Sequence, residues 1–177
     1  GDVYKRQDLV NDVIPGVMDG NTQVVVLGTG DSWYEEAFRS YENQYKGSFC
    51  AYIAYDENVA HNIYSGCDAL LVPSRFEPCG LTQLIAMRYG AIPIVRETGG
   101  LRDTVWPYNM FDNTGNGFTF DRYESGLLYD TINRAKTCYF ENRASWDDMV
   151  IRDMNKDVSW ETSARQYKDM YVELTPR

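Results

Sequence analysis

Four short apolar runs, separated by longer mixed segments, constrain the fold of this chain more than any other feature of its sequence. The runs are Gln23–Leu27, Phe49–Tyr55, Ala69–Pro73 and Ala91–Val95. Each is apolar at nearly every position, which is typical of β-strands that are covered on both faces. The runs therefore predict four buried strands of a parallel sheet.

Helical patterns fill the segments between and after these runs. We expect helices over Ser32–Tyr45, Glu57–Ser65 and Leu81–Tyr89 and, beyond a short strand at Gly117–Phe120, over Ser125–Phe140, Trp146–Asn155 and Ser159–Leu174. The alternation predicts an α/β fold, a Rossmann-like doubly wound parallel sheet with right-handed crossovers, followed by C-terminal helices. With 177 residues the chain has the size of one domain. We place this domain at residues 8–177, after a leader at residues 1–7 that fits no element and has no clear origin.

The composition argues against several classes of partner. The net charge of −9 argues against non-specific nucleic-acid binding, which needs a basic surface. No apolar run approaches the ~20 residues of a membrane-spanning helix. A single histidine and four scattered cysteines without a Cys-x-x-Cys pair argue against a metal site and favour reduced thiols. We therefore expect a cytoplasmic protein that uses no metal or other cofactor.

The loops after the four strands are the expected place for a ligand, because doubly wound sheets bind ligands beyond the carboxyl ends of their strands. These loops are 28–32, 54–57, 74–82 and 96–101. The third is the densest in chemistry, with Glu77 followed by Gly80 and Thr82 before a helix. The backbone amides of this turn and the start of the helix suit an anion such as phosphate. The sequence thus predicts one carboxylate beside a phosphate cradle, an arrangement that suits an activated sugar.

Each of these residues also has an ordinary structural interpretation. Glu77 alone could be a negative charge that complements the helix dipole. Cys79 is more often a small buried side chain, and Leu81 a core residue. Tyr55 alone is more often a packing residue, and a Gly99-Gly100 pair alone is a tight turn.

A long string around Glu77 favours the functional interpretation. SRFEPCGLTQLIAMRYGAIPIVRETGGLRDTV, from Ser74 to Val105, resembles the C-terminal lobe of bacterial glycogen synthases and plant starch synthases. The similarity extends upstream through QVVVLGTGD and downstream through DVSWETSARQYKDMY, and so covers nearly the whole chain.

The resemblance implies the nucleotide-sugar-binding lobe of a two-lobed glycosyltransferase of the GT-B fold. Such enzymes transfer glucose from ADP-glucose, or UDP-glucose in some members, to the non-reducing end of an α-1,4-glucan, with retention of configuration and without a metal. The resemblance implies that Glu77 contacts the donor glucose and is catalytic. The substrate-binding residues that it implies are Tyr55 for the nucleotide base, Cys79, Gly80 and Leu81 for backbone contacts to the sugar, Thr82 for the distal phosphate, and Gly99 and Gly100 for the glycine-rich turn.

Two parts of the family pattern are missing from this chain. One is the N-terminal lobe, which carries most of the acceptor site. The other is the start of the C-terminal lobe, where an arginine and a lysine neutralise the diphosphate. We therefore expect the isolated chain to be inactive. Two alternatives stay open: a non-catalytic nucleotide- or glucan-binding module, and a lobe whose partner lobe comes from a separate chain.

Overall fold

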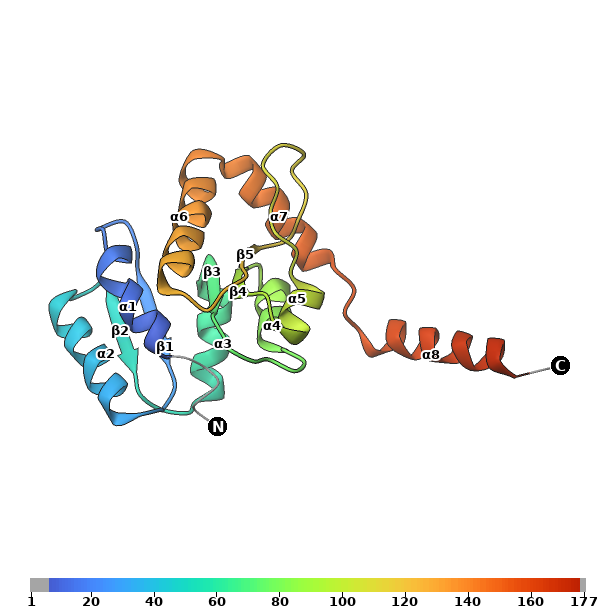
Figure 1. The fold of residues 1–177 in the computed structure, drawn as a ribbon, viewed down its shortest axis with the longest axis horizontal. Helices are drawn as coiled ribbons and strands as arrows, with labels where there is room; N and C mark the ends of the chain where they lie inside the picture. The colour runs from blue at the N-terminus through green and yellow to red at the C-terminus, as the bar shows by residue number, and fades with distance from the viewer. Residues whose placement is uncertain (1–6, 176–177) are drawn as a thin grey trace.

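The computed structural model describes residues 7–175 as helices packed around short parallel strands (Figure 1). The elements in chain order are α1 (Gln7–Val17), β1 (Val24–Leu27), α2 (Ser32–Gln44), β2 (Phe49–Tyr52), α3 (Glu57–Gly66), β3 (Ala69–Val72), α4 (Thr82–Tyr89), β4 (Ile92–Arg96), α5 (Gly99–Thr104), β5 (Phe118–Phe120), α6 (Ser125–Glu141), α7 (Arg143–Asn155) and α8 (Trp160–Leu174).

The strands form two separate parallel sheets. β1 pairs with β2, and Val24 lies opposite Phe49. In the second sheet β4 lies between β3 and β5, so that Ile94 is opposite both Leu71 and Phe118. The predicted α/β fold with parallel strands and flanking helices is confirmed, although its strands form two sheets rather than one.

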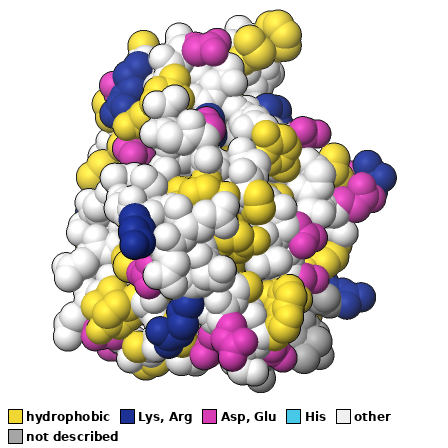
Figure 2. Space-filling view, turned by 90° about the vertical axis from the view of Figure 1, so that its left-hand side faces the viewer, with side chains coloured by type: hydrophobic (Ala, Val, Ile, Leu, Met, Phe, Trp, Pro, Cys, Tyr) yellow, Lys and Arg dark blue, Asp and Glu magenta, His cyan; other side chains and the backbone are white. Residues whose placement is uncertain are grey.

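The expectation that every strand is covered on both faces is wrong for β1 and β2. In β4, Ile92–Val95 are all buried. In β2, buried and exposed residues alternate, and Tyr52 is 43% exposed. Val25 of β1 is 51% exposed. The reason is that α1 and α2 pack against one face of the β1–β2 sheet, whereas the other face is only partly covered. Figure 2 shows hydrophobic side chains scattered among acidic and basic ones on the side of the molecule where α2 lies.

Helices α1 and α6 pack against each other and connect the two sheets. Leu9 and Val13 of α1 share a core cluster with Leu128 of α6, Ile92 of β4 and Phe118 of β5. Burial of these side chains favours the packing of the two sheets into one body.

The sequence patterns did not predict α1. Pro15 lies inside this helix, and proline is ordinarily a signal against a helix interior. Because α1 begins at Gln7, the expectation that residues 1–7 fit no element is wrong for Gln7. Residues 1–6 lie outside the described part of the chain, so the leader remains a prediction for them.

The C-terminal helices differ in their packing. α7 contacts α4 and α6, whereas α8 extends away from the rest of the molecule and has no buried residue (Figure 1). Over residues 7–175, no helix has the length and apolarity needed to span a bilayer. The four cysteines are free thiols, and in the same range no three His, Cys, Asp or Glu side chains cluster closely enough to hold a metal ion.

Candidate functional site

Glu77 lies in the loop that leaves the carboxyl end of β3, and a buried serine contacts its side chain. Ser74 is 3% exposed, and its Oγ donates a hydrogen bond to Glu77 Oε2 over 3.4 Å. Glu77 itself is half-buried. The carboxylate therefore lies at the strand edge where a ligand is expected, with one oxygen oriented from within the loop.

Arg96, the last residue of β4, anchors this loop. Its Nε donates to the Ser74 carbonyl oxygen over 2.9 Å, and its Nη2 donates to the carbonyl oxygen of Arg75. Nη1 donates to the Asp121 carbonyl oxygen over 3.1 Å. Partial burial lowers the pKa of the Arg96 guanidinium from its usual value. One side chain thus links the segments that follow β3 and β5 through charge-assisted hydrogen bonds.

The glycine pair at the start of α5 lies directly against the Glu77 loop. The Gly100 amide donates to the Glu77 carbonyl oxygen over 3.0 Å. A Cβ on Gly99, which has φ 45°, would overlap that same carbonyl oxygen, and a Cβ on Gly100 would overlap the carbonyl oxygen of Cys79. The contact between the two loops therefore requires glycine at both positions.

A buried glutamine at the start of α4 links the Glu77 loop to α5 through hydrogen bonds. Gln83 has no exposed surface, and its Nε2 donates to the Gly80 carbonyl oxygen over 2.6 Å and to Thr104 Oγ1 over 2.9 Å. Thr104 Oγ1 in turn donates to the Gly100 carbonyl oxygen over 2.6 Å. Gly80 has φ 67°, a backbone conformation that favours glycine.

The N-terminus of α4 presents backbone donors beside Glu77. Its first helical hydrogen bond runs from the Ile85 amide to the Leu81 carbonyl oxygen, which leaves the amides of Thr82, Gln83 and Leu84 without a partner inside the helix. No side chain caps this helix. Asp31 and Asp56, by contrast, cap α2 and α3. The α4 terminus is thus an electropositive backbone end with Thr82 exposed at it.

The structure brings together most of the predicted site residues. The contacting segments after β3 and β4, which include the first residues of α4 and α5, contain Glu77, Cys79, Gly80, Leu81, Thr82, Gly99 and Gly100. Cys79 is exposed and Leu81 is 69% exposed, so neither is the core residue that the structural alternative predicted.

Tyr55 is the predicted residue that stays apart. It follows β2, in the other sheet, and is 85% exposed. Its hydroxyl donates to Glu57 Oε1 over 3.3 Å. Tyr55 is therefore not packed into a core of the residues that the structure describes.

Four residues of the site were missed from the sequence: Ser74, Gln83, Arg96 and Thr104. None of them stands out by its local pattern, because the role of each depends on a hydrogen-bond partner 3 to 25 positions away in the chain. The usable signal was the position of Arg96, a charged residue at the end of an otherwise apolar strand.

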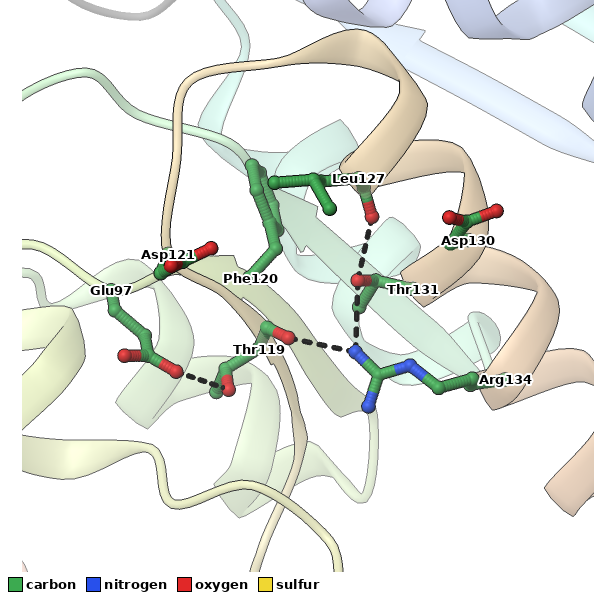
Figure 3. A pocket seen from close by; sticks show the side chains of 8 residues that line it. All are labelled: Glu97, Thr119, Phe120, Asp121, Leu127, Asp130, Thr131 and Arg134. Carbon is green, nitrogen blue, oxygen red and sulfur yellow. Dashed lines mark hydrogen bonds between the residues drawn. The ribbon is translucent and has the colours of Figure 1, made fainter.

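A hollow of about 600 Å³ lies beside the site, against the outer edge of β5 (Figure 3). Thr119 Oγ1 donates to Glu97 Oε1 over 2.7 Å, and Arg134 Nη2 donates to the Thr119 carbonyl oxygen over 2.8 Å. Arg134 thereby satisfies a carbonyl of an edge strand. None of the predicted site residues lines this hollow.

Comparison of the sequence with known proteins identifies the family of this chain. The pattern of the group 1 glycosyl transferases matches residues 2–150. Glycogen synthase from Lachnoclostridium phytofermentans is 47% identical over 167 residues, which are 94% of this chain and 35% of that protein. Soluble starch synthase 1 from Solanum tuberosum is 45% identical over 175 residues, 97% of this chain and 27% of that protein.

A solved structure gives the same result. The catalytic domain of starch synthase IV from Arabidopsis thaliana, bound to ADP and acarbose, superposes with a TM-score of 0.83 at 34% identity. The match covers 96% of this chain and 36% of that one, so the chain spans about a third of the length of its relatives. The expected resemblance to glycogen and starch synthases is confirmed, and the chain belongs to the group 1 family of glycosyl transferases.

Proposed function

We propose that this chain is the donor-binding lobe of a glycogen or starch synthase, which transfers glucose from ADP-glucose or UDP-glucose to the non-reducing end of an α-1,4-glucan with retention of configuration. The observation that carries the proposal is the contact between the Glu77 loop and the Gly99–Gly100 turn, which sets a carboxylate beside the uncapped N-terminus of α4. The identity to glycogen and starch synthases supports this reaction class.

In this proposal Glu77 interacts with the donor glucose. As the bond from the sugar to the diphosphate breaks, positive charge develops at the anomeric carbon and negative charge on the leaving phosphate. The Glu77 carboxylate, held by Ser74, stabilises the positive charge at the anomeric carbon. The backbone amides of α4 and the Thr82 hydroxyl stabilise the negative charge on the phosphate. The backbone of Cys79, Gly80 and Leu81 contacts the sugar.

Two further parts complete the proposed donor site. Gly99 and Gly100 let the backbone of α5 approach the Glu77 loop closely enough to shape the sugar pocket. The exposed ring of Tyr55 stacks on the nucleotide base. No metal enters this scheme.

An isolated lobe lacks the groups that an opposing lobe contributes. The acceptor glucan and the remaining diphosphate contacts require polypeptide beyond the matched third of the relatives. Removal of a single preorganised donor costs about 10²–10³ in rate, and loss of substrate positioning costs more. In this proposal the chain by itself is therefore inactive. We further propose that the protein is cytoplasmic.

The test is an assay of ADP release with ADP-glucose and glycogen, combined with calorimetric titration of ADP. We expect turnover by the complete parent enzyme, none by the isolated chain, and weak binding of ADP to the chain. Turnover by the isolated chain at a rate near that of the parent enzyme would overturn the proposal that the isolated chain is inactive. Absence of any ADP binding at millimolar concentration would overturn the donor site.

A second candidate is a non-catalytic nucleotide- or glucan-binding module. The exposed ring of Tyr55 favours this candidate, because it can stack on a base or a sugar without any catalytic step. Two measurements separate the candidates. A glucan-binding module binds maltooligosaccharide in a titration without ADP, and a non-catalytic module of either kind leaves the complete parent protein without ADP release from ADP-glucose and glycogen.

A further inference from the structure

A lysine that follows α7 contacts the last residue of α5, 52 positions earlier in the chain. The Nζ of Lys156 donates a hydrogen bond to the Thr104 carbonyl oxygen over 3.0 Å. The same ammonium group lies 4.7 Å from the ring centroid of Trp106, which is a cation–π contact. Lys156 thus holds both the end of α5 and the start of the loop that follows it.

The surroundings of Lys156 favour a fixed ammonium group at this position. Lys156 is half-buried, and burial lowers the pKa of its ammonium from the usual value, while the nearby carboxylate of Asp153 opposes this shift. The Thr104 carbonyl oxygen lies at the C-terminal end of α5, where carbonyl groups have no partner inside the helix. This end of a helix carries the negative pole of its dipole, so a cation is favoured there.

Helix α5 is short, and hydrogen bonds hold it at both ends. It contains six residues. At its end, the Thr104 carbonyl oxygen also accepts from Asn116 Nδ2 over 3.0 Å. At its start, the Gly100 amide donates to the Glu77 carbonyl oxygen over 3.0 Å. Thr104 Oγ1 joins the two ends through its 2.6 Å hydrogen bond to the Gly100 carbonyl oxygen. A shift of Thr104 is therefore passed to Gly100 and so to the Glu77 loop.

The apolar contacts of α5 do not fix its position along the sheet. Leu101 and Val105 are buried in a core cluster with Val72 of β3 and Val95 of β4. This packing holds α5 against the sheet, but hydrophobic attraction has no direction. Hydrogen bonds do depend on direction, so those at the two ends of α5 oppose its sliding along the strands.

We infer that Lys156 is a positioning residue of the donor site, which holds the end of α5 and, through Thr104 and Gly100, keeps the Glu77 loop in place. Lys156 touches no substrate in this scheme. Its effect on turnover rests on the proposed function, whereas its effect on the loop does not.

Site-resolved hydrogen exchange of the chain tests the effect on the loop without any nucleotide sugar. Lys156→Met removes the ammonium group and keeps a long apolar side chain, and Lys156→Arg keeps a cation that can donate. Lys46→Met, at an exposed position after α2, is the matched loss of charge. We expect exchange at the Gly100 amide to accelerate by at least about fivefold in Lys156→Met and by less than about twofold in the other two variants. The Glu97 amide, which donates to the carbonyl oxygen of Phe120, is the internal reference.

The same variants in the complete parent enzyme test the effect on the reaction. A displaced Glu77 loop weakens an interaction that acts in the transition state, whereas the backbone donors of α4 still bind the diphosphate. We therefore expect Lys156→Met to lower kcat for ADP release by at least about fivefold and to change KM for the sugar donor by less than about twofold. Lys156→Arg should retain most of this kcat, and Lys46→Met all of it.

The outcomes distinguish this inference from the proposed function. Faster exchange at Gly100 alone, in a parent protein that transfers no glucose, would support the role of Lys156 in holding the loop and overturn only the proposed function. Three results would overturn the inference: unchanged exchange at Gly100 in Lys156→Met, equal acceleration at Gly100 and Glu97, or an unchanged kcat in a parent enzyme that does transfer glucose.

Discussion

The Gly100 amide and the Glu77 carbonyl oxygen lie 3.0 Å apart and form the hydrogen bond that joins the loop after β4 to the loop after β3. This contact fixes the backbone on which the Glu77 carboxylate stands. The site consists largely of backbone groups, which a few buried side chains hold in place. Substitutions can therefore distinguish residues that stabilise the site from residues that act on the substrate.

Gly100→Ala tests the close approach of the two loops. The added Cβ would overlap the Cys79 carbonyl oxygen, so the loops must separate. We expect the free energy of unfolding to fall by about 1–3 kcal/mol, as for other overpacked sites. The measurement is urea denaturation of the chain. Gly66→Ala at the end of α3 is the control, because its Cβ would meet no atom within 4 Å; equal midpoints for the two variants would contradict the prediction.

Arg96→Met tests the anchor at the end of β4. The substitution removes hydrogen bonds to the carbonyl oxygens of Ser74, Arg75 and Asp121 while keeping an apolar stem. Hydrogen bonds from charged groups contribute about 1.5–3 kcal/mol each, so we expect a loss of at least about 2 kcal/mol in urea denaturation. Arg102→Met, at an exposed position of α5, should unfold like the unmodified chain. A stable Arg96→Met variant would show that the loop holds without its anchor.

Asp153 makes the stability of the chain depend on pH. This side chain of α7 is 2% exposed, and neither carboxylate oxygen has a hydrogen-bond partner. Burial raises the pKa of Asp153 from 3.8 to about 7, against the opposing charges of Lys156 and Arg152. Since the folded state holds the proton more tightly than the unfolded state, the free energy of unfolding falls as pH rises from about 4 to about 7.

Asp153→Asn removes this dependence. The variant should gain on the order of 4 kcal/mol relative to the unmodified chain at pH 8, and little at pH 4. Urea denaturation across this pH range is the measurement, with Asp169→Asn on the exposed face of α8 as the control. Parallel pH profiles for Asp153→Asn and the unmodified chain would rule out Asp153 as the source.

Glu77→Gln tests the proposed chemistry in the complete parent enzyme. The amide keeps the size of the side chain and its contact with Ser74 but removes the negative charge. We expect kcat for ADP release to fall by at least about 10²-fold, with an unchanged urea midpoint, because Glu77 lies at a half-buried strand edge. Glu36→Gln, on the exposed face of α2, should keep full activity. A fully active Glu77→Gln enzyme would remove Glu77 from the mechanism.

Thr82→Val tests the phosphate cradle. Valine has nearly the shape of threonine but no hydroxyl, while the backbone amides of α4 stay in place. We expect KM for the sugar donor to rise about fivefold with a smaller change in kcat, since one neutral hydrogen bond contributes about 1 kcal/mol. Thr137→Val, on the exposed face of α6, is the matched control. An unchanged KM would place the diphosphate elsewhere.

Much of the fold followed from local patterns. The runs at Val24–Leu27 and Ile92–Arg96 are strands within a residue or two of their expected ends. The helices at α2 and α6 begin where capping residues and apolar spacing predicted them. α1 was missed because Pro15 contradicts the helical pattern, and tertiary packing on α6 overrides that local preference.

The sequence alone determined the order of strands and helices from β1 onward, the loops that follow the strands, and the candidate residues from Glu77 to Thr82, because these depend on neighbours along the chain. Only the tertiary structure decided that Gly99 and Gly100 contact the Glu77 loop, that Arg96 holds it, and that the strands divide into two sheets. Such contacts join residues far apart in the sequence, and their formation depends on how whole surfaces fit together, which no local pattern encodes.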